Sequence, residues 1–215
     1  SAPGTITRQD SYIRSDRLGI TFISSIDSHN NAERYRNALI LGAGWNRWPL
    51  YWDRVETAPD SWNWAAYDNL VESDLRNQLE INAILLGRPE FRANGASIQG
   101  INEPIFADGK DIPTAGVAIN PNNHWAKYVY NAVSRYKPGG ILSRQRNLRP
   151  DQGISVWEIW NEPDFAPFWQ GGVIAYARLL KTAYIVIKNV DPSATVLFGG
   201  LLYATDETWL TQTLA

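Results

Sequence analysis

The feature that most constrains this chain is the regular alternation of short apolar runs with longer amphipathic segments. The short runs are bounded by turn-forming residues and span 18–23, 45–50, 81–86, 154–160 and 194–198. The longer segments carry apolar residues at helical spacings and span 30–41, 64–79, 121–136 and 173–190. Strands that alternate with helices are typical of a parallel sheet with helical connections. The sequence therefore predicts an α/β fold with about five strands and four helices.

The length of the chain limits how this pattern can close. No linker or internal repeat divides the 215 residues, and we expect a single domain over 1–215. A complete eight-stranded (β/α)8 barrel of the TIM type takes about 250 residues, or about 30 for each unit. Three further units do not fit after the fifth predicted strand. The chain is therefore expected to be an incomplete (β/α)8 barrel or, alternatively, an open α/β sheet.

Composition and charge exclude several classes of function. The formal net charge is −2 and basic residues are scattered, which gives no electrostatic support for nucleic-acid binding. The longest apolar segment, 173–190, is interrupted by charged residues, so no membrane span is expected. The absence of Cys excludes disulfides and thiol chemistry. The chain starts at Ser1 and contains no Met, which suggests a removed signal peptide and secretion from a bacterium, or a cloned start and a cytoplasmic protein.

Aromatic residues are unusually frequent, with ten Trp and ten Tyr. Such rings can pack on the faces of sugars, and they can equally fill a protein core. For any one Trp, both interpretations are open. The two histidines, His29 and His124, are isolated from each other, and we expect neither a metal ligand set nor a cofactor.

The strongest candidate for chemistry is Glu162, which follows the apolar strand 154–160. Cleavage of a glycosidic bond needs a carboxylic acid that protonates the leaving oxygen, together with a second carboxylate. In a barrel these groups lie where strands end at the C-terminal face. The neighbouring Asn161 can bind a sugar hydroxyl, and Pro163 ends strand pairing. Nearby aromatic residues would raise the pKa of Glu162 by desolvation; they are Trp157, Trp160, Phe165, Phe168 and Trp169.

The run 157–164, WEIWNEPD, resembles the acid/base strand of clan A glycoside hydrolases, the retaining (β/α)8-barrel superfamily, and especially family 39-like xylosidases and iduronidases. Supporting similarity lies in 45–48, 52–56, 62–64, 68–71 and 87–91, and it covers the first half to five-eighths of the barrel. The resemblance implies a retaining double displacement on an oligo- or polysaccharide, with Glu162 as general acid/base. It also implies that Arg47 supports the nucleophile. The nucleophilic glutamate of that superfamily ends the seventh strand, and no segment of this chain corresponds to it.

A predicted substrate-binding set surrounds these catalytic candidates. It consists of His29, Trp48, Arg88, Glu90, Trp160, Phe165 and Phe168. His29 has a surface role or a role at the helix entry as its alternative. Arg47 could form an ordinary ion pair with Glu158, and Glu162 could cap the following helix. Glu103 belongs to a second Asn-Glu-Pro, but no apolar strand precedes it, so we interpret it as a loop residue.

Two further alternatives concern the whole chain. A non-catalytic carbohydrate-binding or scaffold protein could keep the aromatic cleft without turnover. A lyase or aldolase is disfavoured because no Lys or metal set stands at a predicted strand end. An incomplete barrel would expose the edges of its first and fifth strands. We therefore expect a homodimer or a companion fragment that covers them.

Overall fold

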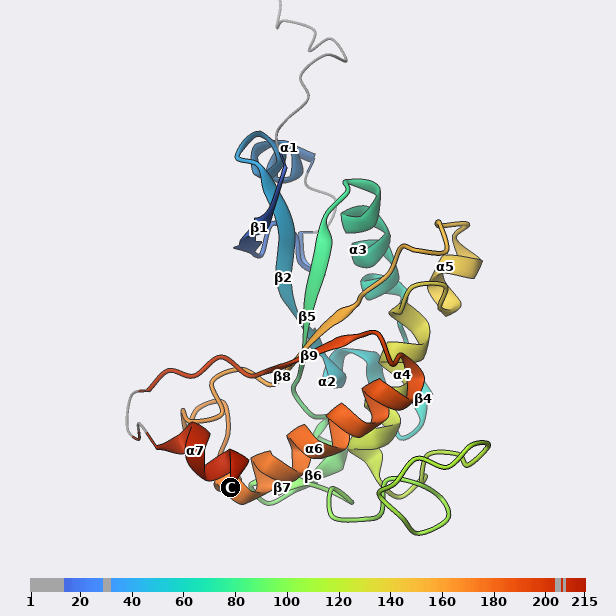
Figure 1. Cartoon of the computed structure of the whole chain (residues 1–215), viewed down its shortest axis with the longest axis vertical. Helices are drawn as coiled ribbons and strands as arrows, with labels where there is room; N and C mark the ends of the chain where they lie inside the picture. The colour runs from blue at the N-terminus through green and yellow to red at the C-terminus, as the bar shows by residue number, and fades with distance from the viewer. Residues whose placement is uncertain (1–13, 29–31, 204–205, 207) are drawn as a thin grey trace, which may run out of the picture.

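The computed structural model describes residues 14–28, 32–203, 206 and 208–215. A five-stranded parallel sheet forms its centre, in the order β1-β2-β5-β8-β9. Its strands are β1 (Ser15–Thr21), β2 (Ala43–Tyr51), β5 (Glu80–Leu86), β8 (Val156–Ile159) and β9 (Thr195–Phe198). The strand order follows the chain order, and the sheet curls as part of a barrel wall would (Figure 1). The structure is thus an incomplete (β/α)8 barrel, as predicted.

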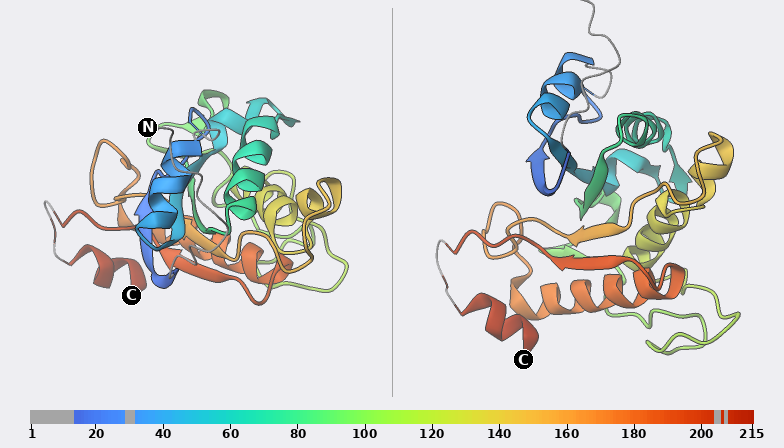
Figure 2. Two further views of the ribbon diagram at one scale, coloured as in Figure 1. Left: turned by 90° about the horizontal axis from the view of Figure 1, so that it is seen from above. Right: turned by 45° about the horizontal axis from the view of Figure 1, so that its top comes forward.

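Helices connect successive strands and cover the outer face of the sheet, as Figure 2 shows from two sides. The four longer helices are α1 (Ala32–Ile40), α3 (Ala65–Arg76), α4 (His124–Tyr136) and α6 (Gly172–Val190). Shorter helices are α2 (Trp52–Val55), α5 (Ile141–Gln145) and α7 (Trp209–Leu214), with one 3-10 turn, η1 (Glu90–Arg92). Two small antiparallel hairpins, β3 (Glu56–Ala58) with β4 (Ser61–Trp62) and β6 (Ala93–Asn94) with β7 (Ser97–Ile98), lie in the connections. Within the described residues, no helix is long and apolar enough to cross a membrane.

The predicted helical segment 121–136 would have Asn120 as its cap, but α4 starts three residues later. The helix begins at His124, and the Asn123 side chain caps it by accepting a hydrogen bond from the Ala126 backbone N–H at 3.0 Å. Asn120 instead holds the preceding turn, because its amide donates to the Pro104 carbonyl at 2.9 Å. The first strand also runs from Ser15 to Thr21 instead of 18–23.

The main core fills the space between the sheet and the helices α3, α4 and α6. Most of the Trp residues belong to it: Trp48, Trp52, Trp125, Trp157, Trp160, Trp169 and Trp209 are all buried. Trp52, for example, stacks on Tyr128 with ring centroids 5.1 Å apart. For five of these seven, packing is the explanation that the structure supports, while Trp160 and Trp169 also line a cavity.

The opposite, concave face of the sheet is open. Side chains alternate along a strand, so Trp45 and Arg47 of β2 face this side, while Asn46 and Trp48 face the helices. A groove of about 370 Å³ follows the concave face, and its lining includes Arg47, Asn82 of β5 and Leu197 of β9. The register pairs Arg47 with Asn82, and Ile84 with Glu158. Polar side chains of three neighbouring strands therefore meet on this face.

Candidate active site

The backbone turn that follows β8 is strained and firmly held. Trp160 and Glu162 have φ angles of 68° and 45°, in the left-handed region that non-glycine residues rarely adopt. Each such residue costs about 1–3 kcal/mol and persists only where its surroundings fix it. The Trp160 backbone N–H donates to the Leu85 carbonyl at 3.0 Å, and the Glu162 N–H donates to the Gly200 carbonyl at 2.8 Å. The Trp160 indole N–H donates to the Phe168 carbonyl at 3.0 Å. The turn is therefore tied to the β5 and β9 ends on either side.

Below this turn, Glu158 of β8 is buried in a cluster of hydrogen-bond donors. The Arg47 guanidinium binds it in a bidentate manner, with Nε to Oε2 at 2.8 Å and Nη2 to Oε1 at 2.7 Å. The Asn82 amide donates to Oε2 at 3.1 Å, and the Gly200 N–H donates to Oε1 at 3.2 Å. A buried carboxylate with this set of donors is well compensated for its loss of hydration. The ion pair with Glu158 that we considered for Arg47 is thus present.

Arg47 also links this pair to the catalytic candidates. Its Nη2 donates to Asn161 Oδ1 at 3.0 Å. The pKa of Arg47 is raised above its ordinary value, chiefly by its hydrogen bonds to Glu158, with a smaller electrostatic contribution from Glu162. The structure therefore brings together Arg47, Asn161 and Glu162. Among the described residues, no donor forms a hydrogen bond with the Glu162 carboxylate.

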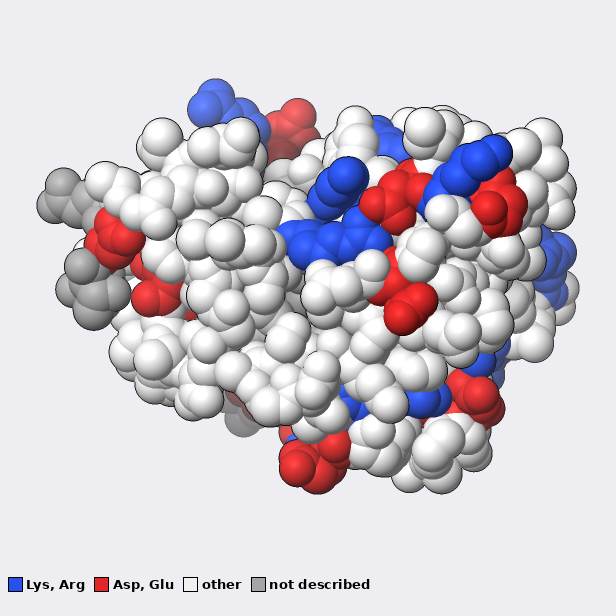
Figure 3. Space-filling view, turned by 90° about the horizontal axis from the view of Figure 1, so that it is seen from below, with Lys and Arg blue, Asp and Glu red and all other residues white. Residues whose placement is uncertain are grey.

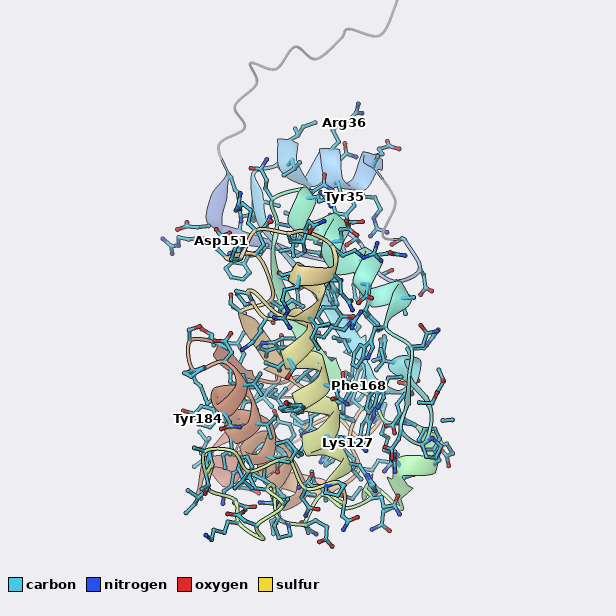
Figure 4. All side chains as sticks on the ribbon, turned by 90° about the vertical axis from the view of Figure 1, so that its right-hand side faces the viewer. Tyr35, Arg36, Lys127, Asp151, Phe168 and Tyr184 are labelled. Atoms are coloured by element: carbon cyan, nitrogen blue, oxygen red, sulfur yellow. The ribbon has the colours of Figure 1, made fainter. Side chains whose placement is uncertain are left out.

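A cavity of about 260 Å³ lies at the ends of β5 and β8. Its lining includes three of the predicted substrate-binding residues, Arg88, Trp160 and Phe168. Arg88 already binds the β6–β7 hairpin, because its guanidinium donates to the carbonyls of Ser97 and Gly95. Phe168 is exposed, and its ring lies 6.1 Å from that of Phe165 (Figure 4 labels Phe168). The cavity wall therefore offers aromatic surface beside the strained turn.

Several predicted residues do not line this cavity: Trp48, Glu90 and Phe165 of the substrate-binding set, and the catalytic candidates Asn161 and Glu162. Trp48 faces the helices with no exposed surface, and its indole N–H donates to Asp74 at 2.8 Å. The prediction that Trp48 contacts substrate is therefore wrong, because Arg47 and Trp48 are neighbours on one strand and must face opposite sides. Glu90 is exposed at the start of η1 and lines neither of the two cavities described above. His29 lies outside the described residues.

Trp157 also departs from the expected arrangement. It is fully buried on the helix-facing side of β8, and its indole N–H has no partner among the described residues. Because Glu158 occupies the concave side, Trp157 faces away from the pocket and cannot desolvate Glu162. The second Asn-Glu-Pro lies in a loop, as predicted, where the Glu103 carbonyl accepts from Asn123 and Arg178.

The structure also adds residues that the sequence analysis did not assign to the site. Asn82 and Gly200 complete the shell around Glu158. Asp164, buried behind the turn, accepts hydrogen bonds from the backbone N–H groups of Leu202 and Tyr203 at 3.0 and 2.6 Å. The Gly199-Gly200 pair directly follows the fifth predicted strand. It was the sequence signal for the contact of Gly200 with Glu158, since glycine lets two backbones approach closely. An added Cβ at Gly199 would lie 2.7 Å from the Ile159 carbonyl oxygen.

Fold and site together define a class: a partial (β/α)8 barrel whose polar residues meet at the C-terminal ends of adjacent strands. Solved structures that share this fold are glycoside hydrolases. A GH39 β-xylosidase from Caulobacter crescentus matches with a TM-score of 0.58 and 21% identity, over 94% of this chain and 44% of that chain. A glucosidase from Croceicoccus marinus matches with a TM-score of 0.52 and 18% identity, over 84% of this chain and 35% of that chain.

The GH39 enzyme from Xanthomonas axonopodis pv. citri is similar to the same extent, with a TM-score of 0.52 and 19% identity over 86% of this chain and 34% of that chain. The chain thus spans between about a third and under half of the length of these solved structures. No family model and no curated protein matches the sequence. At these identities the likeness shows the fold alone, a partial (β/α)8 barrel.

Proposed function

We propose that this chain carries the acid/base portion of a glycoside hydrolase that cleaves O-glycosidic bonds by retaining double displacement. The observation that carries the proposal is the contact of Arg47 with both Glu158 and Asn161, beside the unbonded carboxylate of Glu162. The fold shared with solved glycosidases supports the same reaction class. The substrate is an oligo- or polysaccharide, and the protein is secreted.

In this mechanism Glu162 acts twice. It first protonates the glycosidic oxygen as the sugar bonds to a second carboxylate, and it then takes a proton from the water that releases the sugar. The rigid turn fixes where its carboxylate lies, and Asn161 binds a sugar hydroxyl beside it. Arg47 acts through its contacts with Asn161 and Glu158, which it holds in place. In retaining enzymes the two carboxyl groups stand about 5–5.5 Å apart. We place the nucleophile in a part of the protein beyond these 215 residues.

The role of Glu162 can be tested in the protein that includes the remaining barrel. Glu162→Gln should lower kcat/KM for alkyl or phenyl glycosides by about 10²–10⁴-fold, because their leaving groups need a proton. Dinitrophenyl glycosides, whose leaving group needs none, should lose far less in the first step. Added azide should restore turnover by replacing water as the nucleophile of the second step. Glu103→Gln, in the other Asn-Glu-Pro, is the matched control and should keep full activity.

Equal losses on both kinds of substrate, or no loss at all, would contradict the acid/base role. For the 215 residues alone we expect little or no turnover of aryl glycosides. Turnover by this chain that disappears in Glu162→Gln would show that the chain supplies both carboxylates itself.

A second function, a carbohydrate-binding or scaffold role without turnover, is favoured by one observation. Glu158 and Asp164 are the buried carboxylates near the turn, and both are occupied as hydrogen-bond acceptors. Neither is free to act as the nucleophile. A mechanism-based glycosidase label separates the two functions, because it attaches covalently to a complete enzyme and leaves a binding protein unmodified.

A further inference from the structure

A second concave site lies on the outer, helical side of the molecule. It is a groove of about 770 Å³ between the outer face of α4, the loop before it, the start of α5 and the end of α6. Its polar lining includes Lys127, Tyr130, Asn131, Ser134, Lys137 and Arg144. We call it the α4 groove. It shares no lining residue with the cavity beside Trp160. Its volume falls within the range of about 300–1,000 Å³ that is usual for ligand sites.

Helical periodicity explains why these polar side chains gather. Residues 127, 130, 131 and 134 lie three or four positions apart and so share the outer face of α4, while Trp125, Tyr128 and Val129 are buried beneath. Tyr130 is 42% exposed. The side chains of Tyr130, Asn131 and Ser134 form no hydrogen bond with any described residue. One wall of the groove therefore carries an aromatic ring, an amide and a hydroxyl whose hydrogen-bonding groups have no partner among the described residues.

The charged side chains that line the groove are all positive. Three cations and no carboxylate line it. Lys127 is paired with Asp60 at 2.6 Å, but Lys137 and Arg144 contact only the neutral carbonyls of Val190 and Gly139, at 2.8 and 2.5 Å. Among the described residues, no carboxylate forms a salt bridge with Lys137 or Arg144.

Two arginines close to the groove on the chain are paired with carboxylates, unlike Lys137 and Arg144. Arg135 follows Ser134 on the chain and is paired with Asp68 at 2.6 Å, and Arg146 is paired with Glu72 at 3.4 Å. Neither arginine lines the groove. Figure 3 shows a further part of the surface, where basic and acidic side chains lie next to one another. Lys137 and Arg144 thus give the lining of the groove a positive charge that no carboxylate among the described residues neutralises.

We propose that the α4 groove binds an oligosaccharide that bears carboxylate groups. Tyr130 supplies a flat apolar ring for a sugar face, and Asn131 with Ser134 supplies donors and acceptors for hydroxyls. Lys137 and Arg144 neutralise the carboxylates of the ligand. This proposal stands on the groove alone and does not depend on catalysis by Glu162.

The charge requirement can be tested by calorimetric titration of this chain with a short oligogalacturonate. The fully methyl-esterified form of the same oligomer is the matched ligand, because it keeps the sugar chain and removes the charge. We expect binding of the acid form that weakens as salt increases, and at least about tenfold weaker binding of the ester. Equal binding of the two forms, or no binding of the acid form, would overturn the proposal.

The location can be tested with two substitutions and a matched control for each. Arg144→Gln and Tyr130→Ala should each raise the Kd for oligogalacturonate by about fivefold or more. Arg149→Gln and Tyr184→Ala are the controls, since both residues are well exposed, at 71% for the Arg149 side chain and 51% for Tyr184, and lie outside the groove. Figure 4 labels Tyr184 on α6 and Lys127 on α4. All four variants should keep the melting temperature of the parent chain. Unchanged affinity in both groove variants would refute the assignment of the binding site to the α4 groove.

A last comparison separates a sugar site from a general anion site. An oligoglutamate of the same charge should bind at least about fivefold more weakly than oligogalacturonate, because it lacks hydroxyls and a ring face for Tyr130. Equal binding of the peptide would show an acidic-peptide or nonspecific anion surface and refute the saccharide proposal. Glu162 does not line the groove, so failure of this titration is distinct from failure of the proposed hydrolase function.

Discussion

At the scale of single residues, the acidic side chains near the end of β8 differ in the hydrogen bonds that they accept. Glu158 accepts hydrogen bonds from Arg47, Asn82 and Gly200, so donors inside the protein compensate its negative charge. Asp164 accepts from two backbone N–H groups of the segment after β9. Glu162 differs from both, because its backbone is bonded to Gly200 while its carboxylate is unbonded among the described residues. Of these three carboxylates, Glu162 is therefore the one that we propose for chemistry, and the other two support the turn.

Asp164 should be required for the order of the segment at 200–203. Asp164→Ala removes the acceptor for the N–H groups of Leu202 and Tyr203, which should lower the free energy of unfolding by about 1–3 kcal/mol. Hydrogen exchange at these two amides should become faster, as measured by NMR or mass spectrometry. Asp151→Ala is the control, since the Asp151 side chain is 73% exposed and pairs only with Arg149. Unchanged protection at residues 202 and 203 would refute this role.

At the scale of elements, the start of α4 joins the helix to the β3–β4 hairpin and η1. His124 is its first residue, and its Nε2 accepts from the Arg92 guanidinium at 3.3 Å. Arg92 in turn forms a buried ion pair with Glu56 at 2.6 Å. The pKa of His124 is lowered, first by burial and then by the positive charge of Arg92. The neutral ring is therefore the form that suits this junction.

A pH dependence of stability follows from this lowered pKa. The unfolded chain binds a proton at His124 near pH 6.5, whereas the folded chain binds it only at lower pH. The contribution of neutral His124 to the free energy of unfolding is thus present above about pH 6.5 and is lost as the pH falls through the folded-state pKa of His124. Urea unfolding midpoints should decrease over this window in the parent chain, and His124→Gln, which cannot titrate, should flatten the decrease. An identical slope in the variant would contradict this account.

Elements with a clear period were predictable, and their detailed contacts were not. All five strands and the four long helices overlap the segments that the apolar pattern predicts, although β1 begins before its predicted segment and α4 begins after the start of its own. The same pattern should have separated Arg47 from Trp48, because neighbours on a strand face opposite sides, yet we assigned both to the site. The choice of Asn123 over Asn120 as helix cap depends on the fold of the preceding loop, which has no period.

The site itself was predictable in part. The motif at 157–164 placed Glu162 and Asn161 at a strand end, and the structure brings Arg47 to them. The supporting contacts of Asn82 and Gly200 with Glu158 depend on strand register across three strands, which a single sequence does not encode locally.

At the scale of the whole molecule, the sheet ends in two edges. Within the part of the chain that the structure describes, β1 and β9 each pair with one neighbouring strand, and Leu18 of β1 is 39% exposed. Edges of this kind offer unpaired backbone groups to other strands. The concave groove between them is open as well. The molecule therefore presents a surface that suits a second copy or a companion fragment.

We predict that the chain associates at micromolar concentrations. Light scattering should give a mass above 24.2 kDa that rises with concentration, because a second chain would cover the edges and the concave face. Leu18→Lys should shift the equilibrium toward the monomer by placing a charge on the β1 edge, and Leu214→Lys, exposed on α7, should not. A strict monomer at every concentration would refute the prediction.

The open concave face has a consequence for the ion pair between Arg47 and Glu158. The Arg47 side chain is 30% exposed there, so water screens its attraction for the carboxylate. A second copy or a companion fragment bound to this face would expel that water and lower the local dielectric constant. The attraction between the charges of Arg47 and Glu158 would then be stronger. The guanidinium would then hold Asn161 more stiffly as well. If the chain assembles through this face as we predict, assembly would strengthen the contacts of Arg47 with Glu158 and Asn161.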